Sequence, residues 1–291
     1  MSSCGPTSKL ACGALLALTA CSQNEAVVEN SPARIDVELS AWPSTTLSLT
    51  EVGAPPLAVV RVSADGDGAE EIGWETRFET TATRGAVTSD PMRVVQRRTF
   101  RVATSGDAPA TFDFEVTAAS DEAEGGAPVD PTVARSLRGL QGRWRADDRC
   151  GVVDAGIVTV DGPARRHLPG LLRAAVELCP LLPEEPVGVG ARWTTAQVRP
   201  DGATEETAWV LTQRFDDRVV LTFTSHSERD GTRTMAEGRV EVDSGRTVPV
   251  RYDARGQTAS VMPEVNASGS TTPVTWTTTW TMHAEAAPLQ R

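Results

Sequence analysis

The second half of the chain alternates apolar and polar residues with a period of two, and short aspartate-containing turns interrupt this alternation. Such alternation is typical of antiparallel strands that bury one face and expose the other. Aspartate followed by glycine between two alternating runs is a strong signal for a β-hairpin. The pattern therefore predicts a meander of antiparallel strands. The expected strands span residues 193–199, 206–215, 218–227, 232–243 and 274–284.

The first half of the chain carries the same alternation and also holds the two segments that favour helix. Phe112 and Phe114 would share the inward face of one strand. Asp130 suits the N-cap of a first helix that would end near Leu140, and a second helix should lie within residues 167–179. We therefore predict a mainly β fold. It would be a curved antiparallel sheet, half-barrel or sandwich of about twelve strands, with two short helices in the middle of the chain.

The stretch from Leu181 to Trp193 contains two prolines and two glycines. Pro183 and Pro186 bar helix here, and the glycines that follow permit a positive φ or a bulge before the next strand. No strand-to-helix transition surrounds these glycines, so a nucleotide-binding loop is not expected. We interpret the stretch as a rigid hinge that leads into the second part of the sheet, with Trp193 buried behind it.

The start of the chain has the pattern of an export signal. Lys9 precedes about eleven mostly apolar residues, a run too short to span a bilayer. The run ends in Leu18-Thr19-Ala20-Cys21, which resembles the lipobox of bacterial lipoproteins. The resemblance implies cleavage after Ala20 and a lipid on Cys21 that anchors the protein in a membrane. An ordinary secretory signal with a chance cysteine is the alternative.

The lipobox resemblance also sets the expected domain limits and location. Residues 1–20 would be the lipoprotein signal peptide, and residues 21–33 a flexible polar tether. Residues 34–287 would form a single β-rich domain, which could divide into lobes at 34–162 and 181–287. Residue 22 is serine and not aspartate, which favours the outer membrane over the inner one within the cell envelope.

Two cysteines remain beyond the lipobox, Cys150 and Cys179. In an oxidising compartment an even pair favours a disulfide, which would close a loop of about thirty residues. Two buried free thiols are the alternative. A metal site is less favoured, because neither cysteine has a CxxC partner and His167 is the only histidine between them.

The side chains that could carry catalysis are scattered along the sequence. His167, His226 and His283 fit no zinc or triad spacing, and the adjacent acids at 147–148 and 184–185 are expected to be solvated charges. No nucleotide-binding, hydrolase or calcium-binding motif follows the lipobox. A formal net charge of −11 disfavours nucleic acid. We therefore expect no enzyme activity, no cofactor, no metal ion and no nucleic-acid partner.

The hinge residues carry a resemblance to a known family. The run from Pro183 to Trp193 is similar to the Pro-x-x-Pro-Val-x-Val-Gly-x-x-Trp pattern of uncharacterised bacterial lipoproteins, many of them myxobacterial. Residues 130–162 resemble the segment that precedes this motif. The family has no assigned activity, so the resemblance implies no functional residue. A more distant analogy is to lipoprotein carriers of the LolA, LolB and LppX type, whose curved sheet folds round helices.

Two functions fit these observations. The first is an exported lipoprotein with a non-enzymatic binding or scaffold role, whose partner could be an envelope protein. The alternative is a carrier of lipid or another apolar ligand, with Phe112, Phe114 and Trp276 lining a cavity. A low aromatic content of 5% favours a filled core instead. Trp276 and Trp280 share one strand face and could form a platform for sugars, although core packing is the simpler interpretation.

Overall fold

The chain is described by a computed structural model that covers residues 37–62, 68–106, 109–124, 126–129, 131–158, 165, 167–199, 202–246, 248–265 and 271–288. Its contacts separate residues 1–35 from a unit of residues 36–291, and the fold below is that of the second unit. The predicted signal peptide, lipobox and tether lie outside the described residues, as does Asp130.

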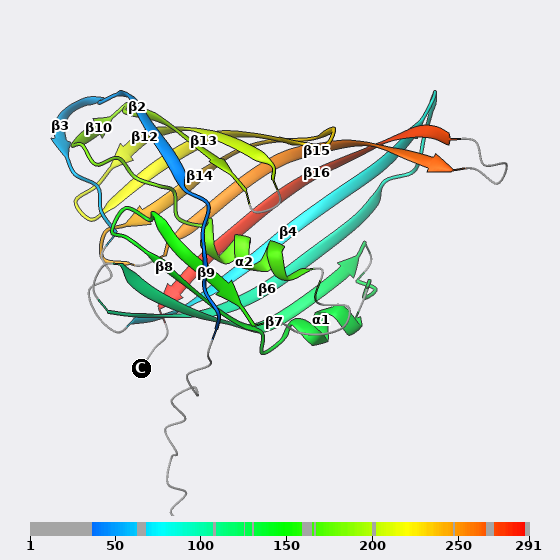
Figure 1. Ribbon diagram of the computed structural model, residues 1–291, viewed down its shortest axis with the longest axis horizontal. Helices are drawn as coiled ribbons and strands as arrows, with labels where there is room; N and C mark the ends of the chain where they lie inside the picture. The colour runs from blue at the N-terminus through cyan, green and yellow to red at the C-terminus, as the bar shows by residue number, and fades with distance from the viewer. Residues whose placement is uncertain are drawn as a thin grey trace, which may run out of the picture. The chain divides into compact units, whose positions relative to one another are not determined.

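Within the described residues, fourteen strands form one large antiparallel sheet, and two more strands form a small separate one. Figure 1 shows the large sheet curving behind α2. Its order is β1-β9-β8-β7-β6-β4-β16-β15-β14-β13-β12-β11-β2, with β5 paired to β4, while β10 pairs with β3. The strands are β1 (Ser40–Ala41), β2 (Thr45–Glu51), β3 (Ala54–Ala58), β4 (Gly68–Arg84), β5 (Val87–Thr88), β6 (Met92–Ser105), β7 (Ala110–Ala123), β8 (Gln141–Ala146), β9 (Val152–Ile157), β10 (Val187–Val189), β11 (Arg192–Val198), β12 (Thr204–Arg214), β13 (Arg218–Arg229), β14 (Thr232–Asp243), β15 (Arg251–Val265) and β16 (Thr271–Pro288).

This architecture confirms the predicted fold class. The alternating runs become strands because each has an apolar face that the sheet can bury on one side only. β15 continues to Val265, where it pairs with Thr271 at the start of β16.

The two edge strands of the large sheet are neighbouring pieces of the same segment. β1 pairs with β9 at one edge, and β2 pairs with β11 at the other. Only residues 42–44 separate β1 from β2 in the chain, so this segment passes from one edge of the sheet to the other.

Two helices lie in the middle of the chain, as predicted. α1 (Pro131–Leu137) buries Val133 and Leu137. α2 (Leu168–Val176) has a proline in its first turn, where the backbone N–H groups have no partner within the helix, so the N–H that proline lacks costs no helical hydrogen bond. α2 buries Leu168, Leu171 and Ala175 among its apolar residues. The apolar stripe predicted for this helix therefore faces the protein interior.

The buried side chains form two clusters. The first includes Phe112, Phe114 and Trp144, and the rings of Phe112 and Trp144 stack with centroids 4.8 Å apart. The second surrounds Trp193, which is 2% exposed and confirms the burial expected at the end of the hinge. Phe112 and Phe114 thus belong to a filled core and line no described cavity. Trp276 is 41% exposed, so the expectation that it packs in the core is wrong.

Candidate binding cavity

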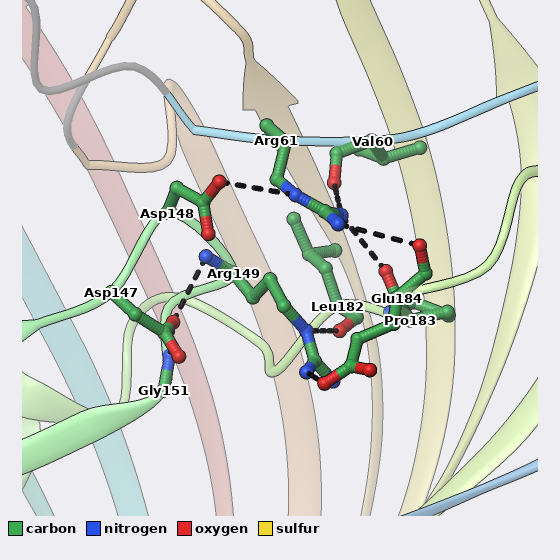
Figure 2. A network of polar contacts seen from close by, with 9 residues as sticks. All are labelled: Val60, Arg61, Asp147, Asp148, Arg149, Gly151, Leu182, Pro183 and Glu184. Atoms are coloured by element: carbon green, nitrogen blue, oxygen red, sulfur yellow. Dashed lines mark hydrogen bonds and ion pairs between the residues drawn. The ribbon is translucent and has the colours of Figure 1, made fainter. Parts of the chain in front are cut away.

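A network of polar contacts holds the start of the hinge (Figure 2). The Arg61 guanidinium donates to the backbone carbonyls of Val60, Pro183 and Glu184 at 2.8, 3.0 and 3.3 Å. Its Nε also lies 3.1 Å from a carboxylate oxygen of Asp148. A planar guanidinium can satisfy several acceptors at once, so Arg61 joins three separate segments of the chain.

Three residues of the two acid pairs belong to this network: Asp147, Asp148 and Glu184. An Asp147 carboxylate oxygen accepts from the backbone N–H groups of Arg149 and Gly151 and so orders the turn between β8 and β9. The Arg149 guanidinium pairs with Glu184 and donates to the Leu182 carbonyl at 2.8 Å. The side chains of Asp148 and Glu184 remain 52% and 72% exposed, so they are solvated charges, as expected, and each also pairs with an arginine.

A disulfide joins Cys150 to Cys179, with 5.8 Å between the Cα atoms. The bond confirms the predicted pairing and excludes the free-thiol alternative. Cys150 lies in the β8–β9 turn with a φ of 64°, and Cys179 follows the end of α2. The disulfide and the Arg61 network therefore fix the end of α2 and the hinge beside the sheet.

A cavity of about 490 Å³ lies between α2 and the sheet face that α2 covers. This volume is within the range of roughly 300 to 1,000 Å³ that is typical of small-molecule sites. Residues from α2, from the disulfide and from strands β2 and β11–β16 line it. Its wall is unusual because one sheet face supplies both aromatic and polar side chains.

A row of polar residues crosses eight neighbouring strands, and all of its members except Thr278 and Thr80 line the cavity. Each member lies directly opposite the next in the strand register, so all of them share one face of the sheet. Arg173 and Glu177 of α2 contact this row, which shows that it faces the helix. We call it the polar row: Thr45, Gln197, Glu205, Ser227, Thr234, Thr258, Thr278 and Thr80.

Some hydroxyls of this wall are partnered and others are not. Thr234 and Thr258 hydrogen-bond each other at 3.0 Å. Ser227, in the polar row, and Thr207, in the adjacent row, line the cavity at 8% exposure. Within the described parts of the chain, neither hydroxyl has a hydrogen-bonding partner. Neither oxygen is among the fully buried side-chain atoms that lack a partner, so both hydroxyls face the open space of the cavity and are suited to contact a bound molecule or water.

Two arginines and two glutamates gather at one side of the cavity. Arg173 pairs with Glu177 one helical turn away and lies 2.6 Å from Glu205, and Arg199 lies 3.7 Å from Glu205. The four side chains keep between 16% and 32% exposure, so this side of the cavity reaches solvent. We call these four residues the charged mouth.

Burial shifts the acid–base behaviour of two groups beside the cavity. Burial raises the pKa of Glu177, an effect that Arg173 opposes and Glu205 reinforces. The Gln197 amide donates to the Glu177 carboxylate at 3.4 Å. Burial also raises the pKa of Tyr252 far above its ordinary value, so its hydroxyl stays protonated at neutral pH and can act as a donor.

The deep side of the cavity is aromatic. Trp209 and Phe223 are 8% and 6% exposed, and their ring centroids are 5.1 Å apart. A Cβ added to Gly256 would lie 2.4 Å from the Trp280 ring, so glycine at this position lets the ring lie against the sheet. Six aromatic side chains line the cavity in all: Trp42, Trp74, Trp209, Phe223, Tyr252 and Trp280.

A second hollow, of about 1250 Å³, lies on the other face of the sheet. Its lining includes Arg93, which pairs with Glu79 and Glu124, and Arg255, which pairs with Glu237. These side chains are exposed and already have partners, as expected for a solvated sheet face. The larger volume therefore reflects an open groove, and the smaller cavity has the features of a binding site.

The remaining candidate residues are not brought together. The ring of His283 lies 2.7 Å from Asp253, and His226 lines the outer groove. Among the residues that the structure describes, no group of three histidine, cysteine or acidic side chains could hold a metal ion. Trp280 lines the inner cavity, whereas Trp276 lies outside its lining. Nor does the described part of the chain contain a helix of the length and apolarity needed to cross a membrane.

Comparisons with known proteins define no class for this chain. No family model matches it, and no curated protein does either. Among solved structures, a similar chain is DynF from the dynemicin biosynthesis pathway of Micromonospora chersina. The two are 12% identical over 88% of this chain and 93% of that one, with a TM-score of 0.21. A similarity this low supports no argument about fold or function.

Proposed function

We propose that this chain is an exported, lipid-anchored protein of the cell envelope that binds a small molecule in the cavity between α2 and the sheet. Its role is non-enzymatic binding. The observation that carries the proposal is the polar row, because a sheet face that only filled a core would be apolar where it meets α2. Cavity hydroxyls that have no hydrogen-bonding partner among the described residues favour a bound molecule that supplies one.

The charged mouth supports binding over catalysis. Glu205 accepts hydrogen bonds from Arg173 and from Ser225, at 2.6 and 3.2 Å, and Glu177 is held by Arg173 and Gln197. Carboxylates fixed by several donors are suited to orient a ligand. The lipobox ending in Cys21 supports the anchor and the location, with the outer membrane favoured by the serine that follows.

A carrier of an apolar ligand is the second candidate. The six aromatic side chains of the cavity favour it, because aromatic walls bury apolar surface well. The polar row argues against it, since an acyl chain would remove water from hydroxyls and carboxylates without replacing their hydrogen bonds.

Mass spectrometry of the intact protein, purified from the membranes of an exporting bacterium, tests this function. We expect a diacylglyceryl-modified Cys21 and a small molecule that co-purifies in a one-to-one ratio. Cys21→Ser should move the protein to the soluble fraction and leave the small molecule bound. Protein that carries no co-purifying compound and binds none from a membrane extract would contradict the binding role, and persistent membrane association of Cys21→Ser would contradict the anchor.

A further inference from the structure

We propose that the ligand of the cavity is an uncharged molecule rich in hydroxyl groups, such as a small saccharide or a cyclitol. This inference rests on the proposed binding function and names the chemical class of the ligand. Three features of the wall carry it: the balanced charges of the four residues in the charged mouth, the hydroxyls that have no partner among the described residues, and the aromatic surface on the deep side.

Counted over its four described side chains with both acids ionised, the charged mouth has no net charge. It contains two guanidinium groups and two carboxylates, and Arg173 bridges Glu177 and Glu205. A cationic ligand would compete with Arg173 for the carboxylates, and an anionic ligand would compete with the carboxylates for Arg173. A ligand hydroxyl can donate to a carboxylate and accept from a guanidinium at the same time, so it can bind without breaking either ion pair.

The hydroxyls of the wall need partners that can both donate and accept. Ser227 and Thr207 are more than nine-tenths buried, line the cavity, and make no hydrogen bond to any residue that the structure describes. Tyr252 adds a protonated phenol to the same wall. An acyl chain would leave all three without partners, whereas a polyol offers each one a hydroxyl.

The aromatic surface suits the apolar faces of a sugar ring. Trp280 lies against the sheet over Gly256, and Phe223 lies over Gly238, where an added Cβ would be 2.6 Å from the phenylalanine ring. Trp280 and Phe223 both line the cavity, alongside the polar side chains. A ring with hydroxyls at its edge and C–H groups on its face can use both surfaces together. Trp280, and not the more exposed Trp276, therefore belongs to the sugar-binding surface.

The test measures thermal stabilisation of the full chain carrying Cys21→Ser by equal concentrations of defined probes. The neutral probes are glucose, galactose, mannose, trehalose, maltose and myo-inositol. The charged probes are glucosamine and glucuronate, and the apolar probe is dodecanoate. We expect saturable stabilisation by at least one neutral probe, with binding at least tenfold weaker for the charged probes and for dodecanoate.

Matched variants place the binding in the cavity. Thr207→Val keeps the side-chain shape but removes the hydroxyl, and binding should weaken by about fivefold to tenfold. Thr204→Val makes the same change on the opposite face of β12, where the residue is exposed, and should bind as the unchanged chain does. Ser227→Ala provides a second hydroxyl deletion if Thr207→Val does not fold.

The outcomes separate this inference from the proposed function. Tighter binding of dodecanoate, glucosamine or glucuronate than of every neutral probe would overturn the ligand class and leave the binding function intact. Failure of all neutral probes would also overturn the ligand class, and the co-purification experiment would then decide the binding function by itself. Equal loss of binding in Thr207→Val and Thr204→Val would contradict the placement in the cavity.

Discussion

Replacing Trp193 with alanine should destabilise the fold strongly. The indole is 2% exposed, stacks on Trp209 with centroids 6.5 Å apart, and donates from Nε1 to the Leu181 carbonyl at 3.1 Å. Truncating a buried tryptophan typically costs about 3 to 5 kcal/mol, through lost burial and a residual cavity. The Leu181 carbonyl would also lose its partner. We therefore expect a loss of about 4 kcal/mol in the free energy of unfolding.

The matched control is Trp276→Ala, because Trp276 is the same residue type in the same sheet but is 41% exposed. It should cost about 1 kcal/mol or less. For a domain of this size, 1 kcal/mol corresponds to a shift of about 2–4 °C in the unfolding midpoint, so Trp193→Ala should shift the midpoint by about 8–16 °C.

Far-UV circular dichroism is the appropriate assay, since tryptophan fluorescence would change with either substitution. Chemical denaturation should show a lower midpoint with an unchanged slope if the variant keeps the native compactness. Midpoint shifts of equal size for Trp193→Ala and Trp276→Ala would refute the conclusion that the hinge is anchored by a buried tryptophan.

Three further predictions concern the frame around the cavity. Arg61→Ala should cost roughly 2 kcal/mol because two part-buried backbone carbonyls lose a charged donor, whereas Arg77→Ala on the exposed face should cost under about 0.5 kcal/mol. Equal losses in denaturant titrations would contradict this. Replacing Cys150 and Cys179 by alanine should cost about 3 to 4 kcal/mol, and thiol labelling of unreduced, unfolded wild type should find neither cysteine free. A hydrogen bond from Arg145 on β8 holds the pKa of Asp154 below its ordinary value. The Asp154 carboxylate therefore stabilises the fold above about pH 4, and this contribution is lost as the pH falls through the lowered pKa. The unfolding midpoint of Asp154→Asn should therefore be lower than that of wild type at pH 7, and the two midpoints should lie closer together in acid. A difference between the midpoints that stays constant across this pH range would count against the ion pair.

Periodicity accounts for most of what the sequence could predict. In the strands after the hinge, apolar and polar residues alternate strongly, and aspartate-containing turns mark the strand ends. Both the fold class and the antiparallel order of these strands can therefore be predicted from local residues. The hinge prolines likewise predict an interruption of regular secondary structure before Trp193. The disulfide followed from the number of cysteines and the export signal, without any knowledge of geometry.

The cavity could not be predicted in the same way, because it depends on register. β12 begins Thr204-Glu205-Glu206-Thr207, and a run that is polar on both faces gives no sign of which residues point inward. Ser227 likewise comes near the end of its strand, among other polar residues. Only the pairing of eight strands shows that such residues form one row beneath α2.

Arg173 and Glu177 illustrate the same difficulty in the helix. Their spacing of four residues was visible in the sequence, and such pairs are usually exposed surface contacts. The position of α2 over the sheet turns this pair inward, where it meets Glu205. The sequence showed the ion-pair spacing, but it did not show whether the sheet covers the helix face that carries this pair.

The central claim is that a small molecule occupies the space between α2 and the sheet, and a steric block tests it most directly. Thr207→Phe places a ring inside the cavity, and Thr204→Phe places the same ring on the exposed face of β12. The measurement is the molar ratio of co-purifying small molecule to folded protein, by quantitative mass spectrometry. We predict a ratio near one for wild type and Thr204→Phe and near zero for Thr207→Phe. An unchanged ratio in folded Thr207→Phe would contradict the claim.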